Sequence, residues 1–258
     1  MGLNKEQIKE KIKEKKELGN LDDSLVHDIL EKYLDRYKLS LENLDKFKIK
    51  IIVKEIRAEL RLYAGRFQKS LKDRMKLLEE GNLDELLKTH TSTSERLEFY
   101  PKIKELLKAL KIRSVLDLGC GINPIVLANK EIEYNAIDIN NDDLILVRKF
   151  FEKNDIKGKV FAYDLRKIKE LPKADICIIF KTLDILEKKP YNLTERIIKI
   201  ADCKYFLISF ATKTISGKPM KYKRRKWFEI LLKNLEIKYE ILNSKNEIFY
   251  SFSKSERH

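Results

Sequence analysis

The spacing of hydrophobic residues along this 258-residue chain changes near residue 111. Up to that point, apolar side chains recur every three or four residues, the spacing that places them on one face of an α-helix. Capping residues and glycines divide the pattern, so that helices are predicted over residues 8–18, 22–37, 44–67, 82–88 and 94–110. We therefore predict an all-α N-terminal domain over residues 1–90.

After residue 111, short apolar runs alternate with helical patterns. Strands are predicted over residues 113–118, 132–138, 159–162, 174–180 and 204–210. Helices between them are predicted over 142–153 and 191–200, with a shorter helix after Pro124. This alternation predicts parallel strands joined by crossover helices in a doubly wound, Rossmann-like α/β sheet.

The C-terminal part departs from the alternation. A helix is predicted over 222–235, and two strands, 237–242 and 247–252, follow it with a short polar turn between them. Two strands joined in this way predict an antiparallel hairpin. We assign residues 91–258 to one α/β domain that ends in this hairpin, which is the layout associated with class I methyltransferases.

The most specific pattern is a glycine turn between two elements. Residues 114–124 read Ser-Val-Leu-Asp-Leu-Gly-Cys-Gly-Ile-Asn-Pro, so that an apolar strand with Asp117 runs into Gly119 and Gly121. About twenty residues later, the next strand ends at Asp138. Such a turn lets backbone approach a nucleoside cofactor closely, and the strand-end acid reaches the ribose hydroxyls. A solvated acid at a strand end is the alternative for Asp138 taken alone.

The form of this turn resembles that of S-adenosylmethionine methyltransferases. The dinucleotide fingerprint needs a third glycine where this chain has Pro124, which disfavours a nicotinamide-dependent oxidoreductase. A further acid, Asp164, follows the third predicted strand. In methyltransferases an acid at this place accepts a hydrogen bond from the adenine amino group, with Leu165 near the ring. The alternative for Asp164 is a helix N-cap.

The charge of the chain indicates a polyanionic partner. Lys and Arg number 55 against 41 Asp and Glu, a formal net charge of +14, and such an excess points most simply to nucleic acid. The alternative is the lysine-rich composition of an archaeal or thermophilic organism or of an AT-rich genome. The three cysteines and three histidines are too scattered to predict a metal site, and no apolar run is long enough to span a membrane. We expect a cytoplasmic protein.

The third predicted helix combines an apolar face with a basic stripe. The apolar face consists of Ile49, Ile52, Ile56, Leu60, Tyr63 and Phe67. The stripe consists of Lys46, Lys50, Lys54, Arg57 and Arg61. Between residues 36 and 76 there are 13 basic and five acidic residues. A solvated face usually mixes its signs, so this stripe is interpreted as a surface that contacts RNA phosphates.

A second basic cluster follows the fifth predicted strand. It consists of Lys213, Lys218, Lys221, Lys223, Arg224, Arg225 and Lys226. Because the ligand crevice of an α/β sheet opens at the strand ends, this segment is predicted to contact RNA near the target base. An ordinary exposed loop is the alternative. Phe180, Tyr222 and Trp227 are candidates for stacking on the base, and each is equally compatible with the core.

Six motifs in order resemble the aminoglycoside-resistance 16S rRNA methyltransferase family. They are Leu-Leu-Lys-Thr-His-Thr-Ser-Thr-Ser-Glu-Arg at 86–96, Leu-Asp-Leu-Gly-Cys-Gly-Ile-Asn-Pro at 116–124, Ile-Phe-Lys-Thr-Leu at 179–183, Ile-Ser-Phe at 208–210, Ser-Gly-Lys at 216–218 and Trp-Phe-Glu at 227–229. The resemblance implies methylation of N7 of a guanine in the decoding A site. N7 carries a lone pair and no proton, so no catalytic acid or base is expected.

The resemblance also implies the roles of individual residues. His90, Thr91, Ser92 and Arg96 would fold over the cofactor, and Arg96 would pair with its methionine carboxylate. Gly119 and Gly121, in the turn opened by Asp117, would face the methionine part. Asp138 and Ile139 would hold the ribose, and Asp164 and Leu165 the adenine. Phe180 and Lys181 would line the site beside the methyl group.

One segment departs from the family pattern and leaves the target open. Pro219 precedes Met220 where the family has glycine, and Arg224 stands where the family has a tyrosine. The predicted partner is 16S rRNA or the small ribosomal subunit, and the protein is expected to be a monomer that binds no metal. The alternatives are a methyltransferase acting on another rRNA or tRNA nucleotide, and a non-catalytic RNA-binding protein that keeps the fold.

Overall fold

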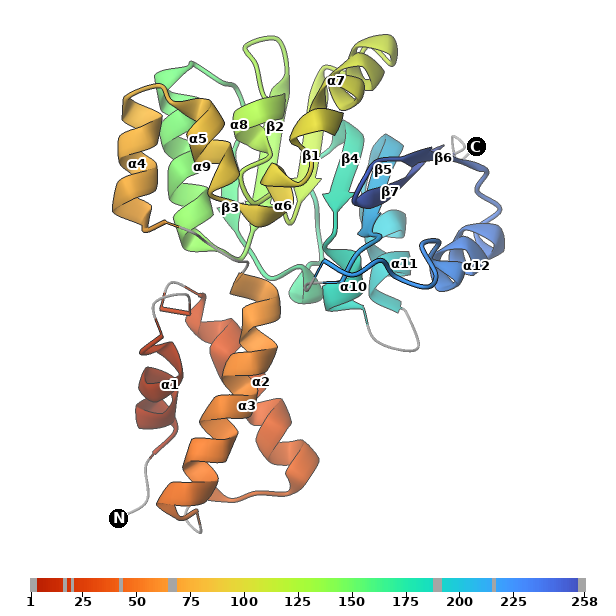
Figure 1. Ribbon diagram of the computed structural model, residues 1–258. Helices are drawn as coiled ribbons and strands as arrows, with labels where there is room; N and C mark the ends of the chain where they lie inside the picture. Colours follow the sequence, from red (N-terminus) through yellow and green to blue (C-terminus); the bar gives the residue numbers. More distant parts are fainter. Residues whose placement is uncertain are drawn as a thin grey trace.

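A computed structural model describes residues 4–15, 18, 19, 21–41, 44–64, 69–187, 192–214 and 217–254. Its centre is a seven-stranded sheet with the order β3-β2-β1-β4-β5-β7-β6 (Figure 1). The strands are β1 Ser114–Leu118, β2 Glu133–Asp138, β3 Val160–Ala162, β4 Ala174–Phe180, β5 Cys203–Ala211, β6 Tyr239–Asn243 and β7 Glu247–Ser253. The first five strands pair in parallel, whereas β7 pairs antiparallel with β5 and with β6. The predicted α/β sheet with a C-terminal hairpin is thereby confirmed.

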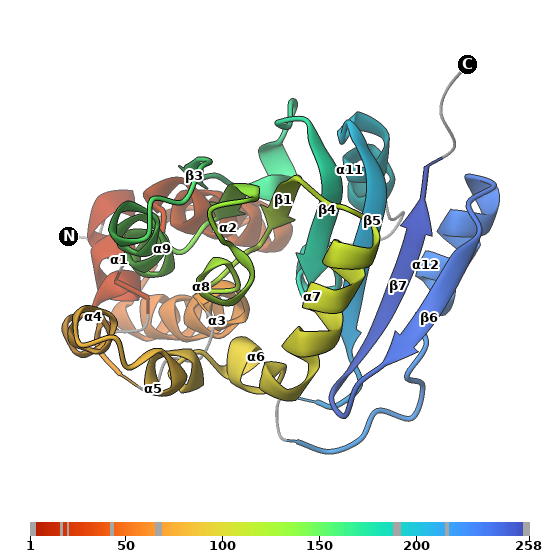
Figure 2. The same cartoon turned by 90° about the horizontal axis from the view of Figure 1, so that it is seen from above.

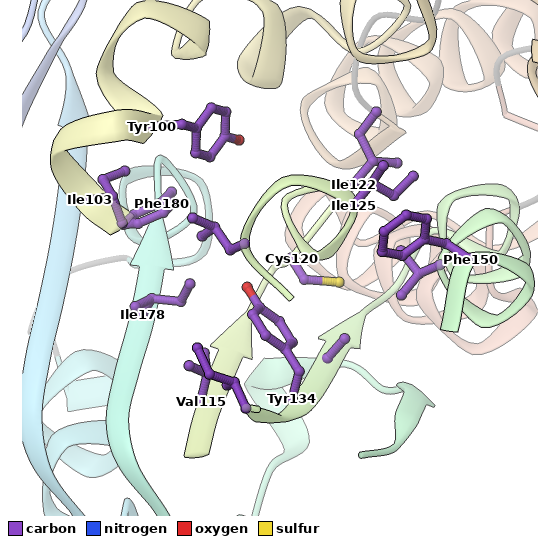
Figure 3. Packing of buried hydrophobic residues seen from close by; sticks show 14 of the residues in the cluster. Tyr100, Ile103, Val115, Cys120, Ile122, Ile125, Tyr134, Phe150, Ile178 and Phe180 are labelled. Atoms are coloured by element: carbon purple, nitrogen blue, oxygen red, sulfur yellow. The ribbon is translucent and has the colours of Figure 1, made fainter. Parts of the chain in front are cut away.

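Helices cover both faces of the sheet (Figure 2). On one face lie α7 Tyr100–Ala109, α8 Pro124–Leu127 and α9 Asn141–Lys153. On the other face lie α11 Asn192–Ile200 and α12 Lys226–Asn234. Each layer has its own buried cluster, because the side chains of a strand alternate between the two faces. Figure 3 shows the first cluster, in which Tyr134 rises from β2 and Phe180 from the end of β4.

Three N-terminal helices form a separate hydrophobic cluster below the strand ends in Figure 1. They are α1 Lys5–Lys13, α2 Asp23–Tyr37 and α3 Lys46–Ala64. Ile49, Ile52, Ile56 and Leu60 are buried in this cluster, as their spacing predicted. The side chain of Tyr63, and Phe67 altogether, lie outside the described residues.

Two further helices, α4 Leu71–Glu79 and α5 Leu83–Lys88, pack elsewhere. Their buried residues Leu78, Leu86 and Leu87 belong to the cluster of the sheet. The hydrophobic packing thus divides the chain between α3 and α4 and not at residue 90. The interpretation of the basic stripe on α3 as an RNA-binding surface of this N-terminal part stays a prediction.

The predicted helix 94–110 is wrong in its extent. The segment consists of the short helix α6 Thr91–Ser94, a 3-10 turn Leu97–Phe99 and then α7. Pro101 stands at the start of α7. Proline has no backbone N–H to bond to the preceding turn, so it is favoured in the first turn of a helix, where that N–H would lack a partner in the helix.

Candidate cofactor and RNA-binding site

The glycine turn lies between β1 and α8, at the carboxyl edge of the sheet. Gly119 and Gly121 have φ of 72° and 48°, the left-handed region that favours glycine. A Cβ at Gly119 would lie 2.3 Å from the Thr182 hydroxyl oxygen, and one at Gly121 would lie 2.7 Å from Cε1 of His90. Packing against these two side chains therefore requires both glycines, before any ligand is considered.

Asp138 ends β2 and organises the same turn. Its carboxylate accepts hydrogen bonds from the backbone N–H groups of Gly121 at 2.8 Å, Ile139 at 2.7 Å and Asn140 at 2.9 Å. Burial and the nearby charge of Asp143 nevertheless raise its pKa above the ordinary value. Asp138 is therefore more than a solvated strand end, and its predicted contact with ribose stays a prediction.

Asp117 lies fully buried beneath the turn. It accepts hydrogen bonds from the Tyr134 hydroxyl at 2.8 Å and from Nδ2 of Asn123 at 3.4 Å. Its other oxygen, Oδ1, is buried without a hydrogen-bond partner. Burial raises the pKa of Asp117 to about 7. A buried acceptor that lacks a donor is uncommon and marks a place where a ligand or water would add one.

Arg96 is held by protein groups on every side. It is 1% exposed, and its Nε and Nη2 donate to Oε2 of Glu247 at 3.1 and 2.9 Å. Nη1 donates to Oδ1 of Asn123 at 2.9 Å, and the guanidinium lies 4.5 Å from the centre of the Phe180 ring. Burial disfavours the charged guanidinium and would lower its pKa. The charge and hydrogen bonds of Glu247 outweigh burial, so the pKa of Arg96 is raised. Glu247 is thus the carboxylate that pairs with Arg96, in the role that the family resemblance gives to the methionine carboxylate.

Lys181 follows β4 and faces the same acid. Its Nζ lies 3.3 Å from Oε1 of Glu247 and also pairs with Glu95. Its backbone has φ of 55°, the left-handed region that non-glycine residues seldom adopt. Phe180, next to it, is 3% exposed and packs against Phe249, which argues against stacking on a base.

His90, Thr91 and Ser92 begin α6 beside this network. His90 caps α6, since its Nδ1 lies 2.7 Å from the Thr93 hydroxyl and accepts the Thr93 N–H at 3.3 Å. Burial and the charge of Arg74 lower the pKa of His90 to about 3, so its ring is neutral. The Ser92 hydroxyl accepts from Arg96 at 3.2 Å. The fold therefore brings His90 to the glycine turn, and the predicted contact of residues 90–96 with a cofactor stays a prediction.

The other end of the strand edge is hollow. A cavity of about 170 Å³ opens at the ends of β2 and β3. It is lined by Asp22, Ser24, Ile139, Ala162, Tyr163, Asp164 and Lys167. The predicted ribose neighbour Ile139 and the predicted adenine acid Asp164 therefore share one pocket. Leu165 is 5% exposed and packs into the hydrophobic core.

Asp164 has the local role that was its alternative interpretation. It caps a 3-10 turn by accepting the Arg166 N–H at 2.9 Å, and Nε of Arg166 binds its two oxygens at 2.9 and 3.0 Å. Burial alone would raise the pKa of Asp164, but the hydrogen bonds from Arg166 outweigh burial and lower it. The carboxylate is thus ionised at neutral pH, and its contact with adenine stays a prediction.

The basic stripe of α3 is largely exposed. Lys46, Lys50, Lys54 and Arg61 all lie on the surface. Arg57 differs, because its Nε donates to the Ile12 carbonyl at 3.2 Å and its Nη2 pairs with Glu14 at 3.2 Å. Arg57 therefore holds the end of α1 against α3 and is less exposed than the other four. The contact of the stripe with RNA stays a prediction.

The segment between β5 and α12 is divided in the same way. Lys218, Lys221, Lys223, Arg224 and Lys226 are exposed, and Lys213 is half-buried. Arg224 is exposed but pairs with Glu229, to which its Nε donates at 2.6 Å. Arg225 is 9% exposed, and it binds the carboxylate of Asp184 at 2.8 Å and the Ala211 carbonyl at 2.7 Å. Its predicted contact with RNA is not supported, because its donors are used within the protein. Ser216 lies outside the described residues.

Two of the aromatic candidates differ sharply in exposure. Tyr222 is 73% exposed, whereas Trp227 packs edge-on against Phe210 with 5.7 Å between ring centres. Tyr222 is therefore the more accessible of these two aromatic candidates, and its stacking on a base stays a prediction.

Two acids and an arginine that complete the site were not predicted from the sequence. Glu247 is 0% exposed and also accepts from the Ser209 hydroxyl at 2.6 Å. A second buried pair joins Arg74 of α4 to Asp143 of α9 at 2.5 Å. The sequence did hold one signal for this role: Glu247 is a charged residue at the start of the apolar run 247–252. A charged group in a core strand needs a buried partner.

Two classes of feature are absent from the described part of the chain. No group of three or more His, Cys, Asp or Glu side chains there could hold a metal ion. No helix there is both long and apolar enough to cross a membrane.

A family model described as ribosomal RNA methyltransferase (FmrO) matches residues 79–233. Among curated proteins, a 16S rRNA (guanine(1405)-N(7))-methyltransferase of Serratia marcescens is 27% identical over 196 residues, which cover 72% of this chain and 76% of that protein. A protein of the same name from Micromonospora rosea is 25% identical over 179 residues, 65% of this chain and 64% of that protein.

Solved structures share the fold. The 16S rRNA methylase ArmA is 27% identical, with a TM-score of 0.59 over 73% of this chain and all of that chain. The 16S rRNA methyltransferase RmtF, solved with S-adenosyl-L-homocysteine, has a TM-score of 0.80 over 98% of this chain and all of that chain. At 20% identity, the likeness to RmtF shows the fold alone.

Proposed function

We propose that this chain, which belongs to the FmrO family of ribosomal RNA methyltransferases, transfers a methyl group from S-adenosylmethionine to N7 of a guanine in 16S rRNA. The observation that carries the proposal is the family match over residues 79–233, which includes the glycine turn, Arg96 and both strand-end acids. Relatives that cover most of this chain are named for this reaction. We further propose that the guanine lies in the decoding A site.

The residues present fit S-adenosylmethionine at three places. The buried Oδ1 of Asp117 lacks a donor, and an ammonium group of a methionine moiety would supply one, directly or through water. Asp138 stands at the end of β2 with one oxygen on the Gly121 N–H, in the position from which an acid reaches a ribose. The cavity beside Ile139 and Asp164 has room at the end where the nucleobase would lie.

The cofactor, when bound, supplies an electrophilic methyl group on a positively charged sulfur. We assign Asp138 and Ile139 to the ribose and Asp164 to the adenine amino group. Arg96 and Lys181 are assigned to the methionine end. Both are already paired with Glu247, so a methionine carboxylate would share or exchange these pairs.

The chemistry of the site suits a nucleophile that carries no proton. Guanine N7 attacks with its lone pair, so transfer requires no general base. His90, with a pKa of about 3, is a poor proton acceptor at neutral pH. Asp117 has a pKa of about 7, but it is 0% exposed and so cannot take a proton directly from a substrate. The protein therefore acts by holding the methyl group and N7 close and in line, which removes orientational freedom before reaction.

Two exposed basic surfaces support an RNA substrate. The α3 surface, defined as Lys46, Lys50, Lys54 and Arg61, lies on the helical N-terminal part. The rim surface, defined as Lys218, Lys221, Lys223, Arg224 and Lys226, follows β5 at the carboxyl edge of the sheet. We propose that the α3 surface binds the phosphates of folded rRNA, while the rim surface and Tyr222 border the target base.

A methylation assay with mapping tests the proposal. The protein and labelled S-adenosylmethionine are incubated with unmodified small subunits, naked 16S rRNA and tRNA, and the labelled nucleotide is identified. Label on N7 of a decoding-site guanine is expected, in the small subunit or in naked rRNA. Label in tRNA or at another rRNA position would move the target. Tight cofactor binding without any transfer would favour the non-catalytic RNA-binding protein.

A further inference from the structure

The N-terminal helical domain is defined as α1, α2 and α3. We infer that it forms the outer wall of the proposed adenine pocket, so that cofactor affinity depends on a segment outside the family match. Asp22 and Ser24, at the start of α2, line the cavity together with Ala162, Tyr163 and Asp164 from the sheet side. The family match begins at residue 79. The inference rests on the proposed function only in naming adenine as the occupant.

The helical domain is attached to the loop that follows β2. Leu21 forms an antiparallel bridge with Asn140, two residues after the proposed ribose acid Asp138. The side chain of Ile139 packs against the hydrophobic cluster of α1, α2 and α3. Leu21 itself is 2% exposed within that cluster. The loop that holds the proposed ribose site is thus also part of the contact between the helical domain and the sheet.

A chain of charges joins the helical domain to the proposed adenine acid. Asp28 of α2 pairs with Nζ of Lys167 at 2.7 Å and lies 3.9 Å from Nη2 of Arg166. Arg166 in turn binds both oxygens of Asp164. Lys167 also lines the cavity. The position of α2 therefore influences where Asp164 and the cavity wall stand.

A wall built from a second domain has a consequence for binding. A ligand that contacts both the sheet and α2 stabilises the arrangement in which α2 lines the cavity. By thermodynamic linkage, that arrangement raises the affinity for the ligand by the same factor. The helical domain also carries the α3 surface. Binding of the cofactor would thus fix the position of the surface proposed to bind RNA.

Filling the cavity from the α2 side tests the inference. Ser24 is exposed and lines the cavity, so Ser24→Trp should fold while its indole occupies adenine space. The matched control is Lys32→Trp, an exposed position further along α2 that is not part of the cavity lining. The probe is S-adenosylhomocysteine, measured by calorimetry on the full chain. We expect Ser24→Trp to weaken binding at least about tenfold and Lys32→Trp to change it less than about twofold.

The outcomes separate the inference from the proposed function. Equal affinity of Ser24→Trp and the unaltered protein would overturn the inference and leave the proposed function standing. If the unaltered protein does not bind S-adenosylhomocysteine, the proposed function itself fails. Hydrogen exchange gives an independent readout without substitution. The probe should slow exchange of backbone amides in residues 21–28, and unchanged exchange there would count against the wall.

Discussion

The two ends of the carboxyl edge differ in how far the protein's own groups pair with one another and fill the space. At the proposed methionine end, Arg96 and Glu247 form a buried pair with hydrogen bonds at 2.9 and 3.1 Å, and Lys181 lies 3.3 Å from the same acid. At the proposed adenine end, a cavity of about 170 Å³ stands open between the sheet and the helical domain. Charges removed from water need partners in the folded protein, whereas an apolar and hydrogen-bonding surface for a base can be left empty.

This difference separates two kinds of contribution to cofactor binding. Residues at the paired end are positioned during folding, so their replacement should change stability as well as binding. Residues that line the open end should change binding with little effect on stability. Substitutions at each end therefore test whether the two ends differ in this way.

The largest effect on cofactor binding is expected at Asp138. Asp138→Ala removes the proposed ribose contact and releases the N–H groups of Gly121, Ile139 and Asn140. We expect S-adenosylhomocysteine affinity to fall at least about 100-fold in calorimetry. Asp155→Ala, at an exposed acid paired with Lys130, serves as control. A loss below about threefold would remove Asp138 from the cofactor site.

Glu247→Gln should lower stability most. The change leaves the buried Arg96 without its counter-charge, and breaking a buried pair in this way costs about 3–5 kcal/mol. The partly buried Lys181 loses one of its two carboxylate partners. Denaturant unfolding measures the free energy of unfolding, with Glu240→Gln on the exposed side of β6 as the matched control. If both variants unfold alike, the network contributes nothing particular to the fold.

Charge reversal on the α3 surface should weaken RNA binding without touching the crevice. Changing Lys46, Lys50 and Lys54 to Glu should lower affinity for 16S rRNA and flatten its salt dependence. The slope of log affinity against log salt should shrink by about 0.9 for each phosphate that the variant no longer neutralises. The control reverses three exposed lysines of α7, Lys102, Lys104 and Lys108. An unaltered slope in the α3 variant, or the same change in both variants, would make the stripe an ordinary solvated face.

The smallest effect concerns pH. The pKa of His90 is lowered to about 3 in the folded protein, while the unfolded chain has the ordinary value near 6.5. Below pH 6.5 the unfolded state therefore binds a proton that the folded state does not, and stability falls as the pH falls. Between pH 7 and pH 5 this amounts to about 2 kcal/mol.

His90→Asn keeps an N-cap acceptor for α6 and removes the titrating ring. The loss of unfolding free energy between pH 7 and pH 5 should therefore be about 2 kcal/mol smaller in this variant. Equal losses in the variant and the unaltered protein would show that His90 does not titrate as a buried group.

The sheet was predictable from sequence because its signals are local. Each strand from 113–118 to 247–252 is an apolar run bounded by turn residues, and the predicted strands differ from the observed ones by at most two residues at an end. The predicted extent of helix 94–110 was wrong because Pro101, a residue favoured in the first turn of a helix, was not taken as the start of a new helix.

The site was predictable only where a motif carried it. His90, Gly119, Gly121 and Asp138 meet in space as the motifs indicated. Arg57 and Arg225 have the same chemistry as their exposed neighbours, and only the fold shows that their donors are used internally. The pairing of Arg96 with Glu247 spans 151 positions of sequence, a distance over which spacing rules carry no information.

The buried Arg225 has a consequence for the segment around it. Its guanidinium ties Asp184, the Ala211 carbonyl and the Lys223 carbonyl together at 2.7 to 3.0 Å. The segment that carries the rim surface therefore loses conformational entropy during folding, so that less remains to be lost on binding. If the rim lysines bind RNA as proposed, little of the free energy of association is then needed to order this segment.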